Sequence, residues 1–225
     1  MLTDSAEGAA AVLLGFAVLR GFRVRIPVLH FIRDAFLDLD QHTRVVSYDD
    51  EPLILVDAHD REQRYLDKAA AHSGAGVLHR AFSVFLFDGS GRVLMQKRAA
   101  GKRLWPGYWS NACCSHPRRG EQTEDAVHRR LLEELNIEAE LSYLFKFEYA
   151  SQYDEDGAEH ELCWVYAGRI SSLPSINLTE MSDVCFQTRD QIDRSIQEQP
   201  DSLTPWFKIE WAHIKKDHSQ WLSAS

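Results

Sequence analysis

The chain has 225 residues, of which 44% are hydrophobic and 26% charged, and its formal net charge is −9. This length and balance fit one globular domain with an extension, and they exclude a largely disordered chain, a collagen and a disulfide-rich miniprotein. The acidic charge also argues against sequence-independent binding of nucleic acid, because such binding needs a basic face.

The first 45 residues differ from the rest and are predicted to be a non-catalytic N-terminal extension. Residues 9–19 form an apolar run that is too short to span a bilayer, which takes about 20 residues. Arginines follow this run, whereas a secretory signal carries its positive charge before the run. A helix on a membrane surface is one alternative. A wrongly assigned start, with Val45 or Val46 as the initiator, is another.

Residues 46–225 are predicted to form one compact domain. Strands are predicted over residues 52–57, 80–87, 92–98, 141–149 and 159–169, with the second and third joined as a hairpin by the turn 88–91. Helices are predicted over residues 63–72, 121–136 and 190–198, and from 205 to about 221.

Periodicity and end signals carry three of these predictions. In the helix 121–136, Val127, Leu131 and Leu135 recur on one face. In the strand 141–149, Leu141, Tyr143, Phe145, Phe147 and Tyr149 alternate to one side, and only Leu144 breaks the pattern. The last helix is expected to start at Thr204-Pro205, with Thr as the N-cap and Pro in the first helical position.

A first group of residues is suited to a metal ion. Glu159 and Glu161 are two apart in a predicted strand, so both carboxylates point to one face and the histidine between them points to the other. His72, His79 and His116 lie in short polar or Gly/Pro-flanked segments. Three imidazoles and two carboxylates would leave one open position on an octahedral ion, and they suit Mn²⁺, Zn²⁺ or Fe²⁺ better than Mg²⁺. For each residue alone, a surface or core position is the alternative.

A second group is basic. Within seven residues that contain no acid lie Lys97, Arg98, Lys102 and Arg103. Further along the chain come Arg118, Arg119, Arg129 and Arg130. Arginine and lysine are the usual partners of phosphate oxygens. A solvated basic face is the alternative interpretation.

A third feature is the segment 105–117, WPGYWSNACCSHP, which combines aromatic rings, small residues, two thiols and a histidine. Cys114 and His116 could be a nucleophile and its base, although their spacing gives no geometric warrant, and a buried thiol is the alternative. No two of the four cysteines are spaced as C-x-x-C. This argues against a thiolate zinc site and indicates a reducing, cytoplasmic compartment.

Five segments occur in the order LHRAFSVFLF, WSNACCSHP, GEQTEDAVHRRLLEEL, EHEL and TPWF. Together they resemble the type 1 isopentenyl-diphosphate delta-isomerases, over roughly residues 52–210. The resemblance implies an α/β (α+β) fold of Nudix type, a mixed sheet between helices. The chain departs from the Nudix signature, because Ser115 and Asn136 stand where Nudix proteins have Gly and Arg130 stands in place of a Glu. The isomerases share the change at Arg130, and fewer carboxylates on this helix argue against diphosphate hydrolysis.

The resemblance also implies roles for single residues. The divalent-metal ligands would be His72, His79, His116, Glu159 and Glu161. The proton-transfer pair would be Cys114 and Glu161, with Tyr149 hydrogen-bonded near the glutamate and Trp206 facing the carbon skeleton. The diphosphate would lie on Lys68, Arg98, Lys102 and Arg130. The expected cofactors are one tightly bound divalent ion (Mn²⁺, Mg²⁺ or Zn²⁺) and a second ion, Mg²⁺, that arrives with the substrate diphosphate and is held by Glu134.

The implied function is interconversion of isopentenyl diphosphate and dimethylallyl diphosphate by a 1,3-proton shift in isoprenoid biosynthesis. A Nudix pyrophosphohydrolase and a catalytically silent diphosphate-binding module are the alternatives. Cys114 and Glu161 argue against the silent module, because binding alone needs no acid–base pair. The expected partner is the isoprenoid diphosphate, with no nucleic acid, no transmembrane segment and a monomeric state.

Overall fold

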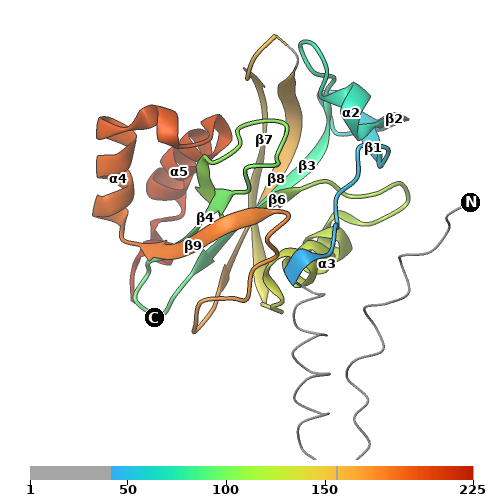
Figure 1. The fold of residues 1–225 in the computed structure, drawn as a ribbon. Coiled ribbons are helices and arrows are strands. Elements are labelled where there is room, and N and C mark those ends of the chain that lie inside the picture. The colour runs from blue at the N-terminus through green and yellow to red at the C-terminus, as the bar shows by residue number, and fades with distance from the viewer. Residues whose placement is uncertain (1–41, 156, 225) are drawn as a thin grey trace, which may run out of the picture. The chain divides into compact units, whose positions relative to one another are not determined.

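A nine-stranded mixed sheet is the central element of the computed structural model, which describes residues 42–155 and 157–224 (Figure 1). Residues 1–41, and with them the apolar run 9–19, lie outside the described residues. The strands are β1 Pro52–Val56, β2 Glu62–Asp67, β3 His79–Phe87, β4 Val93–Arg98, β5 Trp109–Asn111, β6 Cys113–Ser115, β7 Leu141–Gln152, β8 Ala158–Arg169 and β9 Met181–Gln187. The helices are α2 Lys68–Ala71, α3 Thr123–Leu135, α4 Arg189–Glu198 and α5 Pro205–Asp217, with short 3₁₀ turns at Pro200–Ser202 and Ser219–Leu222. In the part of the chain that is described, no helix is both long enough and apolar enough to cross a bilayer.

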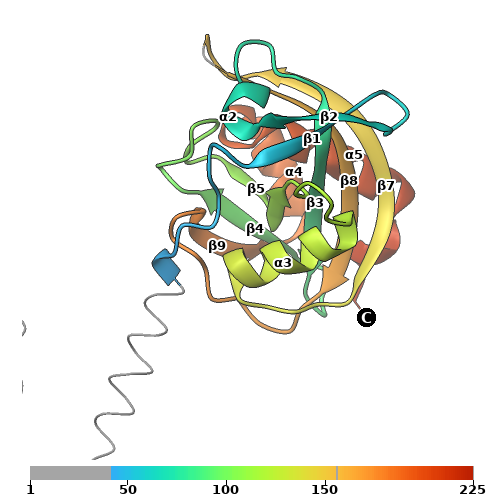
Figure 2. The same ribbon diagram turned by 90° about the vertical axis from the view of Figure 1, so that its right-hand side faces the viewer.

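Helices cover both faces of this sheet. The strand order is β2-β1-β3-β4-β5, and β8 joins it by pairing in parallel with β3 and antiparallel with β7. Helix α3 lies on one face, and α4 and α5 lie on the other (Figures 1 and 2). Alternate side chains of β3 point to opposite faces of the sheet. Val84 and Leu86 pack in the cluster that contains Leu131 of α3. Phe85 points to the other face, where its ring stacks on that of Phe207 of α5 with the ring centres 5.8 Å apart. The predicted mixed sheet between helices is confirmed.

The predicted strands near 52, 80, 92, 141 and 159 and the helices near 121, 190 and 205 are all present. The face of α3 that carries Val127, Leu131 and Leu135 is fully buried, as its spacing predicts. Asn136 follows as the C-cap in the left-handed region, with φ 51°. Asparagine tolerates this conformation better than most residues, so it can occupy the position where the Nudix signature has Gly.

The helix predicted over residues 63–72 is wrong. Its first half, residues 63–67, belongs to strand β2, which pairs antiparallel with β1, Tyr65 opposite Ile54. Between the two strands, Asp57 accepts hydrogen bonds from the backbone N–H groups of His59 and Arg61 and fixes the reversal of the chain. Pairing with a neighbouring strand has overridden local helix preference, and only the four residues of α2 remain helical.

The hairpin predicted between residues 80–87 and 92–98 is also largely wrong. The two strands are present, but β3 and β4 pair only at Phe87 and Val93 before they separate. Strand β4 pairs instead along its length with β9, Met95 opposite Cys185, while β3 pairs along its length with β8. These partners are distant in sequence, so a short turn between two apolar runs does not identify them.

Two further details differ from the sequence prediction. In β7 the register shifts between Tyr143 and Phe145, so the break in alternation at Leu144 marks a β-bulge. Tyr143 therefore contacts Tyr166 on the α3 side, whereas Phe145 belongs to the cluster on the α5 side. The final helix ends at Asp217, earlier than predicted, and its N-cap Thr204 makes no capping bond, because its hydroxyl meets that of Ser110 at 2.9 Å.

Candidate active site

Three adjacent strands place a set of polar side chains at one end of the sheet. In the ladders, Glu161 of β8 is opposite His79 of β3 on one side and Tyr149 of β7 on the other. Glu159 lies two residues before Glu161 and points to the same face. The histidine between them points away and meets Glu148 on β7, as the alternation predicts. His72, the C-cap of α2, adds a second imidazole at this end.

The five residues predicted as metal ligands converge in the structure. Each offers one ligand atom, and these atoms all lie within 4.8 Å of one another. The Nδ1 atoms of His72 and His79 are each 2.7 Å from a backbone carbonyl oxygen, of Lys68 and Val77 respectively. A carbonyl only accepts, so Nδ1 carries the proton and the lone pair of Nε2 faces the cluster.

Two buried atoms in this cluster support a cation site. No hydrogen bond is formed by His79 Nε2 or Glu159 Oε2 among the described residues; their nearest charged neighbours are Glu161 Oε1 at 3.6 Å and His72 Nε2 at 2.9 Å. Buried polar atoms are rarely left without partners. Nitrogen and oxygen donors of this kind suit a divalent transition ion, so the residues present can hold a metal ion.

Glu161 is the most connected member of the cluster. Its Oε1 lies 3.0 Å from His116 Nε2, and its Oε2 accepts a hydrogen bond of 2.8 Å from the Tyr149 hydroxyl. Burial by itself would raise the pKa of this carboxyl, but His79 and the Tyr149 hydrogen bond outweigh it and lower the pKa. Burial raises the pKa of Tyr149 well above its ordinary value. Tyr149 is therefore a hydrogen-bond donor to Glu161 at neutral pH.

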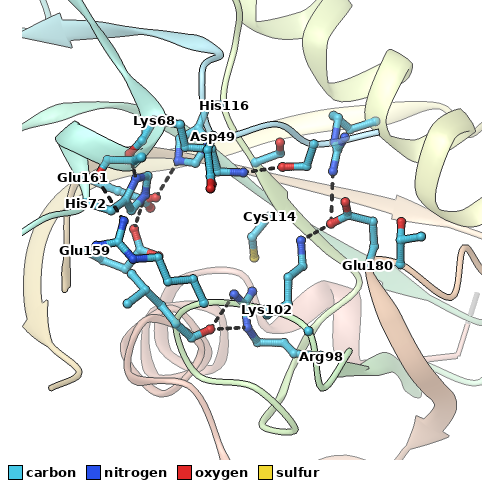
Figure 3. A pocket seen from close by; sticks show the side chains of 18 of the residues that line it. Asp49, Lys68, His72, Arg98, Lys102, Cys114, His116, Glu159, Glu161 and Glu180 are labelled. Carbon is cyan, nitrogen blue, oxygen red and sulfur yellow. Dashed lines mark hydrogen bonds and ion pairs between the residues drawn. The ribbon is translucent and has the colours of Figure 1, made fainter. Parts of the chain in front are cut away.

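Cys114 reaches the same region from β6, where it is opposite Ser83 of β3. Its thiol donates to Asn111 Oδ1 at 3.1 Å and lies 3.3 Å from the Ser83 hydroxyl. Burial raises the pKa of this thiol to about 12. Figure 3 shows the sulfur between the histidine–carboxylate cluster on one side and the side chains of Arg98 and Lys102 on the other. Cys114 is thus a protonated thiol that faces a cavity.

The cavity has a volume of about 380 Å³ and contains residues from each predicted group. Its walls include Cys114, Tyr149, Glu161 and Trp206. Trp206 is 3% exposed, and the Arg98 guanidinium lies 5.4 Å from the centre of its ring. An apolar, aromatic wall next to titratable groups is suited to a small substrate with a hydrocarbon part.

Five basic side chains line the cavity: the four predicted to bind diphosphate, Lys68, Arg98, Lys102 and Arg130, and also Arg103. Glu180, which sequence analysis did not single out, forms an ion pair with Lys102 and lies 3.3 Å from Arg130. Burial alone would raise the pKa of Glu180, but these two cations lower it to about 2. The basic wall is therefore partly neutralised by one carboxylate.

Glu134, Arg118 and Arg129 form ion pairs with other side chains. The Glu134 carboxylate is not among the described residues that line the cavity, and it pairs with Arg130 at 2.7 Å. Arg129 binds Glu121 and so anchors the loop before α3, while Arg118 pairs with Glu51. These two arginines therefore have carboxylate partners outside the cavity.

Comparison with known proteins agrees with this geometry. The NUDIX domain family matches residues 77–207. "Isopentenyl-diphosphate Delta-isomerase 1" from Photorhabdus laumondii is 42% identical over 170 residues, which cover 75% of this chain and 97% of that protein. "Isopentenyl-diphosphate Delta-isomerase" from Pectobacterium atrosepticum is 40% identical over 162 residues, 72% of this chain and 90% of that protein. The chain belongs to the isopentenyl-diphosphate delta-isomerase family.

Solved structures support the fold of this isomerase-family chain. The crystal structure of DR0079 from Deinococcus radiodurans aligns with a TM-score of 0.56 at 22% identity and covers 66% of this chain and 90% of that one. A MutT protein from Methanosarcina mazei aligns with a TM-score of 0.52 at 12% identity, covering 63% of this chain and 95% of that one. At such identities the likeness concerns the fold alone.

Sequence analysis of this isomerase-family chain missed Glu180, which lines the cavity, and the role of Asn111, which accepts a hydrogen bond from Cys114. Glu180 lies in a loop 78 residues from Lys102, and a single acid with no periodic neighbours carries no signal of that contact. Asn111 falls within the quoted WSNACCSHP segment, but its role depends on orientation. Its Nδ2 donates to the carbonyls of Val84 and Cys113, which turns Oδ1 toward the Cys114 thiol.

The segment at the boundary of the predicted extension, residues 44–47, lies beside the basic residues of the cavity. Arg130 donates to the carbonyl of Val46 at 2.6 Å, and Lys68 donates to Ser47. Asn177 binds the carbonyl of Arg44 at 2.8 Å. These bonds place residues 44–47 beside side chains expected to bind diphosphate.

We expect removal of residues 1–41 of this isomerase-family chain to leave turnover unchanged, because no residue predicted to bind metal, transfer protons or bind diphosphate lies there. Removal of residues 1–46 should raise the Michaelis constant, because Arg130 loses its carbonyl partner, an interaction worth about 1.5–3 kcal/mol when a charged group is involved. Steady-state kinetics of the full chain and the two truncated proteins measure both effects. A folded but inactive protein that starts at residue 42 would contradict the first expectation.

Proposed function

We propose that this chain interconverts isopentenyl diphosphate and dimethylallyl diphosphate by protonation and deprotonation of the carbon skeleton. The observation that carries the proposal is one cavity lined by a thiol, a hydrogen-bonded carboxylate, an aromatic wall and five basic side chains. Family membership supports the same reaction. A cytoplasmic location stays a prediction, which the four free cysteines support.

The substrate dictates the order of the chemical steps. An isolated C=C bond has no carbonyl group to acidify its neighbours, so protonation comes first and produces a tertiary carbocation. Of Cys114 and Glu161, one donates a proton to one carbon and the other removes a proton from a second carbon. The face of the Trp206 ring stabilises the positive charge, an effect worth about 2 kcal/mol in a site without water.

We propose that His72, His79, His116, Glu159 and Glu161 hold one divalent ion, Mn²⁺, Mg²⁺ or Zn²⁺. When bound, that ion supplies positive charge that orients the carboxylates and makes a protonated Glu161 a stronger acid. The Tyr149 hydroxyl holds the Oε2 atom of Glu161 in place. His72 and His79 keep their Nε2 atoms directed at the site through their bonds to backbone carbonyls.

For the diphosphate we propose Lys68, Arg98, Lys102 and Arg130, which line the same cavity as the cluster. The Lys102–Glu180 and Arg130–Glu134 pairs would exchange a carboxylate for phosphate oxygens when substrate binds. A Glu134 carboxylate released from Arg130 would be available to the second ion, Mg²⁺, that enters with the substrate. Lys68 can also bind the diphosphate. Burial and the nearby charge of Lys102 lower the pKa of Lys68, and the negative charge of a diphosphate would favour its protonated form.

One incubation tests the proposed reaction. Isopentenyl diphosphate labelled with ¹³C is mixed with the protein and Mn²⁺ or Mg²⁺ in heavy water and followed by NMR. We expect signals of dimethylallyl diphosphate that carry solvent deuterium. Release of phosphate or of a monophosphate would identify a pyrophosphohydrolase instead, and bound but unchanged substrate would identify a binding module.

Substitutions in the basic wall test the diphosphate site. Arg98→Ala and Lys102→Ala should each weaken substrate binding by roughly 1.5–3 kcal/mol, the range for hydrogen bonds to charged groups. Lys97→Ala is the matched control, because Lys97 is not among the described residues that line the cavity. Titration calorimetry with the substrate measures the affinities of the wild-type protein and of the three variants. Equal affinities in the wild-type protein and both wall variants would show that these side chains form only a solvated surface.

A further inference from the structure

Three buried polar side chains connect strand β5 to the start of helix α5. Ser110 and Asn111 lie on β5, and Thr204 is the N-cap of α5. None of the three is exposed to solvent. The Ser110 hydroxyl lies 3.0 Å from Asn111 Oδ1 and 2.9 Å from the Thr204 hydroxyl. Burial of a polar group is costly unless it is hydrogen-bonded, and these contacts satisfy all three side chains.

The orientation of Asn111 is fixed by two backbone carbonyls. Its Nδ2 atom donates to the carbonyls of Val84 at 3.1 Å and Cys113 at 3.3 Å. A carbonyl only accepts, so the amide has a single orientation and Oδ1 is the atom that faces the Cys114 thiol, 3.1 Å away. The two lone pairs of Oδ1 then match its two donors, the thiol and the Ser110 hydroxyl.

The number of available protons sets the direction of the next bond. The single proton of the Ser110 hydroxyl is donated to Asn111 Oδ1, which has no proton to give. The bond between Ser110 and Thr204 must therefore use the proton of Thr204. Thr204 makes no capping bond, so its hydroxyl serves β5 and not its own helix. The result is one chain of hydrogen bonds from Thr204 through Ser110 to Asn111, which also holds Cys114.

The same end of α5 carries Trp206, two residues after Thr204. The backbone of this helix start is also bound to β5, because the Thr204 N–H donates to the carbonyl of Trp109 at 3.0 Å and Leu203 pairs with that residue. The Trp206 indole N–H has no hydrogen-bond partner among the described residues. Its ring is therefore placed by packing, with Trp105 edge-on and the ring centres 5.3 Å apart, and by the position of the helix start.

We propose that Asn111, Ser110 and Thr204 are positioning residues that hold Cys114 and Trp206 in one relative placement. The inference deepens the proposed function and rests on the roles given there to the thiol and the indole ring. Proton transfer and stabilisation of the resulting positive charge need both groups at defined distances from the same substrate. A buried polar network in which every proton has an acceptor is rigid and specifies one arrangement.

Substitutions that remove one hydroxyl test the proposal in the full-length, metal-loaded protein. Ser110→Ala and Thr204→Val should each lower kcat roughly two- to tenfold, the effect of one lost hydrogen bond, with KM and metal content unchanged. Thr204→Ser keeps the hydroxyl and should retain the kcat of the wild type. Because both changes break the same chain, the double variant Ser110→Ala/Thr204→Val should be no slower than the slower single variant.

Thr123→Val is the matched control, because Thr123 is a buried threonine at the start of α3 and is not among the described residues that line the cavity. Its kcat should equal that of the wild type. Equal kcat values in the wild type, Ser110→Ala and Thr204→Val would overturn the proposal. A Thr204→Ser variant as slow as Thr204→Val would overturn it as well.

A second measurement needs no turnover, so it separates this proposal from the proposed function. The infrared S–H stretching band of Cys114 is isolated by subtracting the spectrum of Cys114→Ala, and the ¹⁹F signal of fluorinated Trp206 is assigned with Trp206→Phe. The Ser110 hydroxyl bonds neither residue directly, yet Ser110→Ala should broaden both signals, and Thr123→Val neither. Unchanged signals, or a change at one end only, would overturn the proposal. A wild-type protein with the expected signals that does not isomerise would instead contradict only the proposed function.

Discussion

Cys114→Ala and Glu161→Gln should each fold and yet lose most isomerase turnover. A 1,3-proton shift needs a donor and an acceptor at two different carbons, and these are the two titratable residues matched to such roles. The expected loss in kcat is at least about 10²–10⁴-fold, the usual contribution of general acid–base catalysis. The measurement is the conversion of isopentenyl diphosphate, together with the exchange of substrate protons with heavy water.

The two variants should differ in their metal content. Glu161→Gln removes a proposed ligand and should bind the divalent ion more weakly, whereas Cys114→Ala should retain it. Cys185→Ala and Glu148→Gln are matched controls, because neither side chain is among the described residues that line the cavity. A Cys114→Ala protein with near-normal turnover would reduce the thiol to a packing residue. Tyr149 would then be the first candidate for the missing acid or base.

Removal of the metal should abolish turnover, and added Mn²⁺ or Mg²⁺ should restore it. The physical reason is the convergence of three imidazoles and two carboxylates whose ligand atoms lie within 4.8 Å, with no hydrogen bond at the buried His79 Nε2 and Glu159 Oε2 atoms among the described residues. A bound ion should also raise the free energy of unfolding, by about 2.7 kcal/mol at a concentration 100 times its dissociation constant. Thermal unfolding of the chelated and reloaded protein measures this stabilisation apart from activity.

His116→Ala tests the same site by elemental analysis. The metal affinity of this variant should fall by more than roughly 10–100-fold, the usual loss when a residue that only hydrogen-bonds to a metal ligand is removed. His160→Ala is the control, because His160 lies between the two glutamates on β8 but pairs with Glu148 on the other face. Full turnover in metal-free protein would remove the five-residue site from the mechanism. Equal metal content in both variants would show that His116 is not a ligand.

Local sequence patterns determined much of the fold. The helical spacing of Val127, Leu131 and Leu135 and the apolar run of β3 correctly indicate a buried helix and a buried strand. These signals work because side-chain periodicity reports which face of an element is covered. They fail where pairing between distant segments decides, as in β2, which local preference assigns to a helix, and in β4, whose main partner β9 was not predicted. The break at Leu144 was visible in the sequence, but only the ladder shows that it is a β-bulge.

For the site, the residues of the five motifs and their order along the chain identified the family and the five side chains that converge in the cluster. Spacing alone could place Glu159 and Glu161 on one face, because two-residue alternation is a property of the strand itself. Only the tertiary structure decided that Glu180 pairs with Lys102 and that Asn111 turns its Oδ1 atom toward the Cys114 thiol. The first contact joins segments far apart in the chain, and a hydrogen bond depends on the orientation of both partners. No pattern within one segment contains that information.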